Sequence, residues 1–213
     1  MNDYFYEKIE FLLKKLNLNI NYEIRKISDE YDYLYVTKEY NKIIFNINYD
    51  KVNRALVDVF LLHEIFHAMQ YEQKFPMLIL SEKKKKFDII QKVITDLYNT
   101  EMMIKKGFFE ESLILHNYRL KNAILNINDL EEVEDIYRVS YIIAENEIFF
   151  KNIENNLSDK LKKKFTNKKI KKIHQSIIDK YNKKDIVRMY FDLLKTMENN
   201  INFSCFDKNI IIL

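Results

Sequence analysis

Residues 61–69 read Leu-Leu-His-Glu-Ile-Phe-His-Ala-Met, and the predicted fold is organised around them. His63 and His67 are four positions apart, so on an α-helix both imidazoles lie on one face, where they can bind a single metal ion. Glu64 lies beside them, where a carboxylate can accept a proton from a metal-bound water. The alternative is two core histidines and a satisfied glutamate, but three costly polar groups rarely enter an apolar helix without a partner. The stretch therefore predicts a metal site.

A helix is predicted over residues 51–71, because apolar residues continue on both sides of the motif. These residues cover every face of the helix, which is typical of a central helix that is buried on all sides. Pro76, the only proline in the chain, marks the loop that follows. A histidine pair on such a helix is useful only where it faces a cleft.

Three short strands are predicted before this helix, near residues 19–27, 31–38 and 42–48, where apolar and polar residues alternate with a period of two. The short links between them favour an antiparallel meander. An amphipathic helix precedes the strands over residues 3–17, where apolar residues recur at helical spacing. The sheet is expected to pack on the buried helix.

A second long helix is predicted over residues 84–106, ending at Gly107, the only glycine, in the position of a C-terminal cap. A catalytic zinc takes three protein ligands and keeps a water, so this helix is expected to supply the third ligand. Two acids are candidates. Asp96 lies at the margin of the apolar face, where a cleft wall is expected, and Glu101 lies near the middle of that face.

The remainder of the chain is predicted to be helical up to an extended tail. The expected helices are 109–126, 130–156, 158–182 and 184–199, and the tail is 202–213. The β-branched, apolar end of the tail is expected to pack back as a strand or extended segment, with an open edge of the 19–48 sheet as a candidate partner. The fold class is therefore a mostly helical α+β fold with a small three-stranded antiparallel sheet. We expect a core at residues 1–107 and a helical subdomain at 108–213.

Charge is distributed unevenly over the predicted C-terminal helices. Residues 129–154 carry eight acids against two bases, and residues 159–184 carry eleven lysines against two aspartates. The two segments are expected to attract each other as an antiparallel pair. The lysine-rich segment 159–184 is also a candidate nucleic-acid contact, although charge runs usually form solvated faces.

Four further residues are candidates to stabilise an oxyanion. They are His116, Tyr137, Tyr141 and His174, and the sequence does not select among them. His116 and His174 are both expected at partly exposed helix positions. A group of this kind must reach the cleft, because it stabilises charge that develops in the transition state.

Composition indicates the class of protein and its expected location. The chain has 213 residues, 47% of them hydrophobic and 31% charged, so it is long enough to bury a sizeable core and is expected to be globular. A single cysteine, Cys205, excludes an internal disulfide and a cysteine zinc site, which suits a reducing compartment. The first turns are too polar for a secretory signal, and no apolar run approaches the roughly 18–20 residues of a membrane span. A cytoplasmic protein with no membrane contact is expected.

Two segments resemble known metallopeptidases. His-Glu-Ile-Phe-His at 63–67 is the signature of the zincins, and the order of sheet, motif helix, loop and acidic helix over residues 19–107 is similar to the gluzincin branch, including its compact archaeal forms, the minigluzincins. Residues 93–99, Val-Ile-Thr-Asp-Leu-Tyr-Asn, are similar to the acidic helix of prokaryotic proteins with the same motif, in which an aspartate occupies the position of Asp96. The helix lacks the Glu-x-x-x-Asp pattern of a typical gluzincin. The resemblance implies a zinc peptidase with Asp96 as the third ligand.

We therefore expect a zinc metallopeptidase in which His63, His67 and Asp96 bind Zn²⁺, with Glu101 as the alternative third ligand. Glu64 is expected to be the general base that takes a proton from the attacking water. A peptide or protein substrate is expected along an exposed edge of the sheet. The alternative is a module that binds nucleic acid or protein and whose metal site is structural or degenerate.

Overall fold

The computed structural model describes residues 2–28, 34–51, 55–76, 78–80, 85–127, 132–153, 156–166, 168–197 and 210–212. The chain forms two compact units, one of residues 1–75 and 102–112 and the other of residues 76–101 and 113–213. The predicted mostly helical α+β fold with a small three-stranded sheet is confirmed. The expected boundary at residue 107 falls within the second segment of the first unit.

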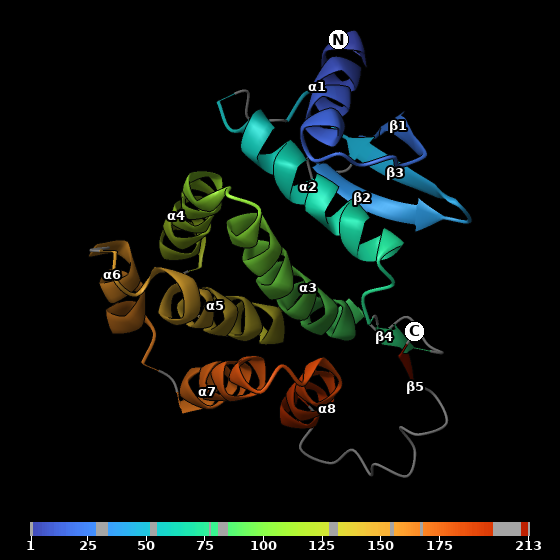
Figure 1. Ribbon diagram of the computed structural model, residues 1–213. Helices are drawn as coiled ribbons and strands as arrows, with labels where there is room; N and C mark the ends of the chain where they lie inside the picture. The colour runs from blue at the N-terminus through green and yellow to red at the C-terminus, as the bar shows by residue number, and fades with distance from the viewer. Residues whose placement is uncertain are drawn as a thin grey trace. The chain divides into compact units, whose positions relative to one another are not determined.

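The first unit holds the sheet and the motif helix (Figure 1). Its elements are α1 (Asn2–Lys15), β1 (Tyr22–Lys26), β2 (Leu34–Glu39), β3 (Lys42–Ile47) and α2 (Val57–Glu72). Helix α2 packs on α1 and on β2. The core gathers apolar side chains from all three layers, among them Phe5, Ile9, Ile43, Phe45, Leu61, Ile65 and Phe66.

The predicted antiparallel meander is wrong, because the sheet is mixed and its strand order is β1-β3-β2. Strands β2 and β3 form an antiparallel hairpin, whereas β1 pairs with β3 in parallel. The physical reason is burial: β3 is the most apolar strand and five of its six residues are buried, so it takes the central position. The ends of β1 and β2 are exposed, which suits the edges of the sheet.

Helix α2 is buried along its length, as predicted. Its buried residues are Val57, Val59, Phe60, Leu61, Leu62, His63, Ile65, Phe66, Ala68, Met69 and Gln70. They point in every direction around the helix axis, because the helix packs against several elements of its unit and not against one. The buried polar side chains of α2, His63 and Gln70, must therefore find their partners inside the protein.

The second unit is built mainly from helices. Its elements are β4 (Leu78–Leu80), most of α3 (Lys85–Lys105) and α4 (Phe109–Asn126), α5 (Val133–Glu145), a π-helix η1 (Asn146–Phe150), α6 (Asn156–Lys164), α7 (Lys168–Asn182), α8 (Ile186–Met197) and β5 (Ile210–Ile212). Helix α5 packs on α6 and α7, and α7 packs on α8. Figure 1 shows α5, α7 and α8 side by side.

Two of the predicted C-terminal helices have different bounds in the structure. The segment expected as one helix over 130–156 is α5 followed by the π-helix η1, and the segment expected over 158–182 is divided into α6 and α7. Phe165 follows the last residue of α6, and its side chain is buried in the core. Thr166 and Asn167 come next, and both residue types favour the start of a new helix.

The end of the tail is a strand, as predicted, but its partner is not the 19–48 sheet. Strand β5 pairs antiparallel with β4, with Ile211 opposite Ile79. Strand β4 was not predicted, because the four apolar residues after Pro76 are too few to show a period. Residues 202–209 and 213 of the predicted tail lie outside the described residues, and so does Cys205.

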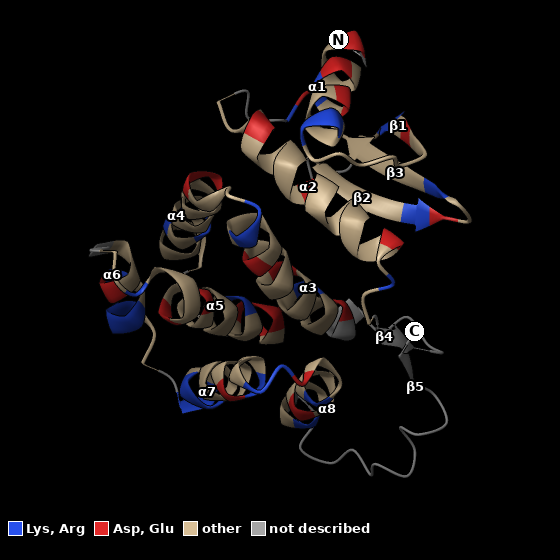
Figure 2. Ribbon diagram, in the orientation of Figure 1, with Lys and Arg blue, Asp and Glu red and all other residues tan. Residues whose placement is uncertain are grey.

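The acidic and basic segments of the second unit make contact through Glu147, and the expected antiparallel pairing of the two segments stays a prediction. Figure 2 shows Lys and Arg on α6 and α7 and acidic residues on α5. Glu147 of η1 accepts hydrogen bonds from Lys162 of α6 at 2.8 Å and from His174 of α7 at 2.9 Å. Burial raises the pKa of Glu147, but the bonds from Lys162 and His174 outweigh it and lower the pKa below the ordinary value.

Candidate metal centre

Helix α2 brings its two histidines together. The Nε2 atoms of His63 and His67 lie 3.0 Å apart, and their ring planes meet at 88°. Two nitrogens that each lie about 2.0–2.1 Å from a tetrahedral zinc ion are about 3.3 Å apart. The spacing of the two ring nitrogens therefore fits a shared ion, as the i, i+4 spacing predicted.

Gln70, one turn further along α2, sets the orientation of the second histidine. Its side chain is fully buried, and its Oε1 lies 3.0 Å from Nδ1 of His67. An amide oxygen only accepts, so Nδ1 of His67 is the donor and the lone pair of a neutral ring is on Nε2. This is the tautomer in which Nε2 can bind a metal ion. Gln70 was not among the predicted site residues, although a glutamine three residues after a candidate ligand lies on the same helix face.

Glu64 is held by the sheet. The backbone N–H of Val36 in β2 donates to Oε2 of Glu64 at 3.0 Å. Burial raises the pKa of Tyr71, and the carboxylate of Glu64 raises it further. Glu64 is half-buried and is not part of the group of candidate ligands.

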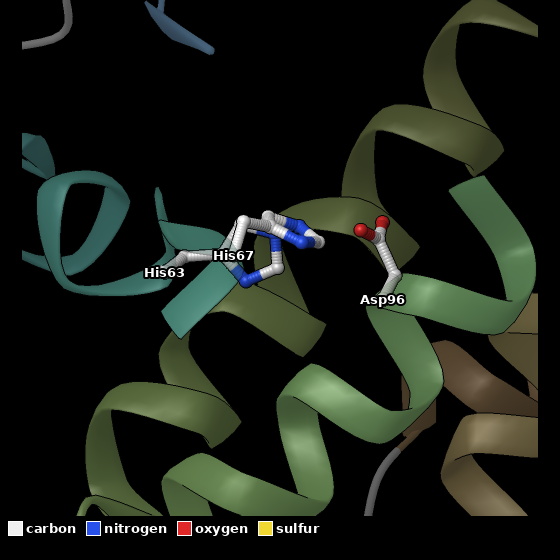
Figure 3. Close-up of side chains that lie close together, drawn as sticks. All are labelled: His63, His67 and Asp96. Atoms are coloured by element: carbon white, nitrogen blue, oxygen red, sulfur yellow. The ribbon is translucent and has the colours of Figure 1, made fainter. Parts of the chain in front are cut away.

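Asp96 of α3 completes a group of three candidate ligands. His63, His67 and Asp96 each offer one ligand atom, and these atoms all lie within 4.8 Å of one another (Figure 3). Within the part of the chain that the structure describes, this is the only group of three or more His, Cys, Asp or Glu residues that could hold a metal ion. The donors are two imidazoles and one carboxylate, a set that could hold a metal ion.

The alternative ligand, Glu101, has a different environment. Its Oε1 accepts a hydrogen bond from Nζ of Lys184 at 2.9 Å, within the second unit. The ammonium group of Lys184 also lies 3.7 Å from the centroid of the Tyr181 ring. Glu101 thus belongs to a cluster with the loop between α7 and α8, and it is not in the group of candidate ligands.

Arg119 of α4 contacts the third candidate ligand. Its Nη2 donates to Oδ2 of Asp96 at 3.1 Å, and its Nη1 donates to Oε1 of Glu145 at 3.0 Å and to the Tyr141 hydroxyl at 2.6 Å. Arg119 was not among the predicted site residues. Arginine is the side chain that can bridge two carboxylates, but nothing in the sequence distinguishes Arg119 from the other four arginines.

Glu145 is the fully buried end of this network. Its carboxylate accepts hydrogen bonds from Thr100 at 2.7 Å, from Tyr141 at 2.7 Å and from Nδ1 of His116 at 2.7 Å. Burial raises the pKa of Glu145, but the Arg119 guanidinium and the bonds from His116 and Thr100 outweigh it and lower the pKa to about 2. Glu145 is therefore an ionised carboxylate inside the helical core.

The four oxyanion candidates have other partners in the structure. His116 was expected to be partly exposed, but it is fully buried, because its two ring nitrogens face Glu145 and Asn146. The hydroxyl of Tyr137 donates to the carbonyl of Leu193 at 2.7 Å, while Tyr141 and His174 are bonded to glutamates. His174 is half-buried, in line with its expected position.

Comparison of the chain with protein-family models, with curated proteins and with solved structures gives no match. The helices that the structure describes include none that is both long enough and apolar enough to cross a membrane. The function must therefore be inferred from the chemistry of the site itself.

Proposed function

We propose that this chain is a metal-dependent hydrolase. More particularly, it is a zinc metallopeptidase that cleaves peptide bonds. The observation that supports this most directly is the convergence of His63, His67 and Asp96, with Glu64 next to the first histidine in the sequence. Two imidazoles and one carboxylate leave one tetrahedral position for a water.

The donor set favours zinc in this proposal. Imidazole and carboxylate ligands in a four-coordinate arrangement suit zinc better than the hard cations Mg²⁺ and Ca²⁺, which prefer six or more oxygen ligands. Bound zinc supplies a water whose pKa is near neutrality and polarises the carbonyl under attack. Gln70 contributes by holding His67 in the metal-binding tautomer.

Glu64 carries the proton in this proposal. Its carboxylate takes the proton of the attacking water and delivers it to the nitrogen of the leaving amine. The hydrogen bond from the Val36 N–H keeps one carboxylate oxygen in place while the proton moves. A bond between β2 and the motif helix thus fixes the position of the general base.

Strand β2 is the proposed binding edge for the substrate. In the described sheet β1 and β2 are the two edge strands, and β2 is the one that contacts Glu64. Because the Val36 N–H points away from β3 and toward Glu64, the main-chain groups of Leu34, Val36 and Lys38 lie along the outer edge. Because the Val36 N–H is taken by Glu64, an extended peptide would pair with the other main-chain groups of this edge and would pass close to Glu64.

Substitution of the proposed base by its isosteric amide tests the function. Glu64→Gln keeps an acceptor for the Val36 N–H, so the fold and the zinc content are expected to be retained. Hydrolysis of an unfolded protein or a peptide library is expected to fall by about 10²–10⁴-fold, because the amide cannot take a proton. Asp58→Asn, at the exposed first turn of the same helix, is the matched control and should leave hydrolysis unchanged.

Two results contradict the proposal. One is loss of zinc in the Glu64→Gln variant, which would make Glu64 a ligand or a structural group. The other is equal hydrolysis by wild type and by this variant. A wild-type protein that binds zinc but cleaves no peptide in the library would favour a structural metal site.

A second candidate function rests on the lysine-rich segment. Lys160, Lys163, Lys168, Lys171 and Lys172 are exposed on α6 and α7, and none of them has an ion-pair partner among the described residues. Such a surface can contact the phosphates of a nucleic acid. If it does, a plot of the logarithm of DNA affinity against the logarithm of salt concentration has a negative slope. The magnitude of this slope should decrease by about 0.9 for each lysine removed. The same slope in a Lys168→Gln, Lys171→Gln, Lys172→Gln variant would contradict this function.

A further inference from the structure

We propose that Arg119 is the positioning residue of the metal centre and that it fixes the Asp96 carboxylate in the orientation that binds the ion. Glu145 in turn holds Arg119. This inference rests on the proposed function of the same site, and it goes beyond it because it identifies a residue that touches neither the ion nor the substrate.

The guanidinium of Arg119 bridges two carboxylates. One terminal nitrogen donates to Asp96 at 3.1 Å and the other donates to Glu145 at 3.0 Å. A guanidinium is planar and its N–H groups point in fixed directions, so the position of one carboxylate constrains the other. The side chain of Arg119 is 16% exposed and that of Glu145 is 1% exposed. Both bonds therefore lie largely out of water, where they are stronger than surface bonds.

Glu145 is anchored more firmly than Asp96. Thr100 of α3, His116 of α4 and Tyr141 of α5 donate to it in addition to Arg119. Donors from three helices thus converge on one buried carboxylate. A buried charge that lost these partners would be costly, so the carboxylate stays in place. Because Arg119 is bonded to the fixed Glu145, it in turn restricts the partly exposed Asp96.

The consequence for the metal centre is pre-organisation. A carboxylate at the surface rotates freely about its terminal bond, and binding an ion then costs conformational freedom. In this chain the bond from Arg119 to Oδ2 of Asp96 restricts that rotation before the ion arrives. Mutation of a residue that hydrogen-bonds to a metal ligand typically lowers metal affinity by about 10–100-fold.

Arg119→Lys is the informative variant. Lysine keeps the positive charge that Glu145 needs, so the helical core is expected to fold, but its single nitrogen lacks the planar fork that reaches both carboxylates. The affinity for Zn²⁺, measured by competition with a chromophoric chelator, is expected to fall by about 10-fold or more. The visible absorption of the Co²⁺-loaded protein is expected to change as well, because the ligand field depends on how Asp96 is oriented.

Three further variants separate positioning from general structural effects. Lys184→Met removes the ion pair to Glu101 on the same helix α3 and is the matched control, with no change expected in affinity or spectrum. Tyr141→Phe removes one hydrogen-bond partner of Arg119 and is expected to give a smaller loss of affinity in the same direction. In an Asp96→Asn background, Arg119→Lys is expected to cause little further loss, because the residue it acts through has gone.

The outcomes distinguish this inference from the function on which it rests. Wild-type protein that binds one zinc ion, together with an Arg119→Lys variant of equal affinity and spectrum, would overturn the role of Arg119 and leave the metal site intact. It would also be overturned if Arg119→Lys caused the same loss of affinity in the wild-type background as in the Asp96→Asn background. Wild-type protein that binds no zinc would overturn the proposed function itself.

Discussion

The Nε2 atoms of His63 and His67 face each other at 3.0 Å on adjacent turns of α2. The ring of His67 presents a lone pair in this direction, because its Nδ1 proton is donated to Gln70. The facing Nε2 of His63 donates its proton to this lone pair, and a cation that takes the place of that proton accepts a lone pair from each nitrogen. This relationship is contained within one helix and is the geometric basis of the proposed metal centre.

Gln70→Leu is expected to weaken zinc binding by about 10–100-fold while the helix stays folded. Leucine fills the buried space of Gln70 but cannot accept the Nδ1 proton of His67, so the ring loses its fixed tautomer. Competition with a chelator measures the affinity. Gln73→Leu, at an exposed position one turn further along, is the control, and equal affinities in the two variants would show that Gln70 has no part in metal binding.

Asp96→Asn is expected to lower zinc affinity strongly, because it removes a charged ligand. The loss should exceed the roughly 10–100-fold that is typical when a hydrogen-bond partner of a ligand is mutated. Glu101→Gln is expected to leave the affinity almost unchanged, since Glu101 is bonded to Lys184. Isothermal titration with Zn²⁺ compares the two variants, which lie on the same helix. The reverse order of affinities would identify Glu101 as the third ligand.

Glu145 is expected to make the stability of the chain sensitive to acid. The pKa of Glu145 is about 2 in the folded protein and 4.5 in its ordinary state, so the ionised carboxylate stabilises the fold above pH 4.5. That stabilisation, on the order of 3 kcal/mol, is lost as the pH falls from 4.5 to 2. Denaturant unfolding should show Glu145→Gln less stable than wild type at about pH 6, with the gap closing toward pH 2. A gap that is constant over this range would contradict the buried ion network.

Deletion of residues 210–213 is expected to expose the backbone of β4. Strand β5 is the hydrogen-bonding partner of Leu78–Leu80, so the amide protons of this strand should exchange faster in the truncated protein. Hydrogen exchange followed by mass spectrometry measures this change. Protection of α2 serves as the internal control and should not change. Equal protection of β4 in both proteins would mean that β5 does not pair with it in solution.

The sequence predicted what depends on local pattern. The buried helix, the paired histidines and the acidic helix follow from spacing, because residues four apart share a helix face in any fold. The order of the strands did not follow, because alternation marks a strand but does not select its neighbour. Strand β3 became central because both of its faces are buried, including the face that carries Asn46, and the alternation of apolar residues on one face did not show this.

The polar network around Asp96 could not be predicted in the same way. Arg119 and Glu145 lie on different helices and are far apart in the sequence, so their contact depends on tertiary packing. Neither residue belongs to a periodic pattern, and His116 was expected to be partly exposed because nothing nearby in the sequence supplies its buried partners. Long-range hydrogen bonds of this kind become visible only in three dimensions.

The most direct test of the proposed metal centre is the zinc content of the purified chain after loading with zinc and dialysis. The metal centre predicts close to one zinc ion per wild-type chain, and almost none after His63→Ala or His67→Ala, because each change removes one of three ligands. Circular dichroism must show that both variants stay helical. Equal zinc content in the wild type and both folded variants would contradict the metal centre. This holds whether all three proteins bind zinc or none of them does.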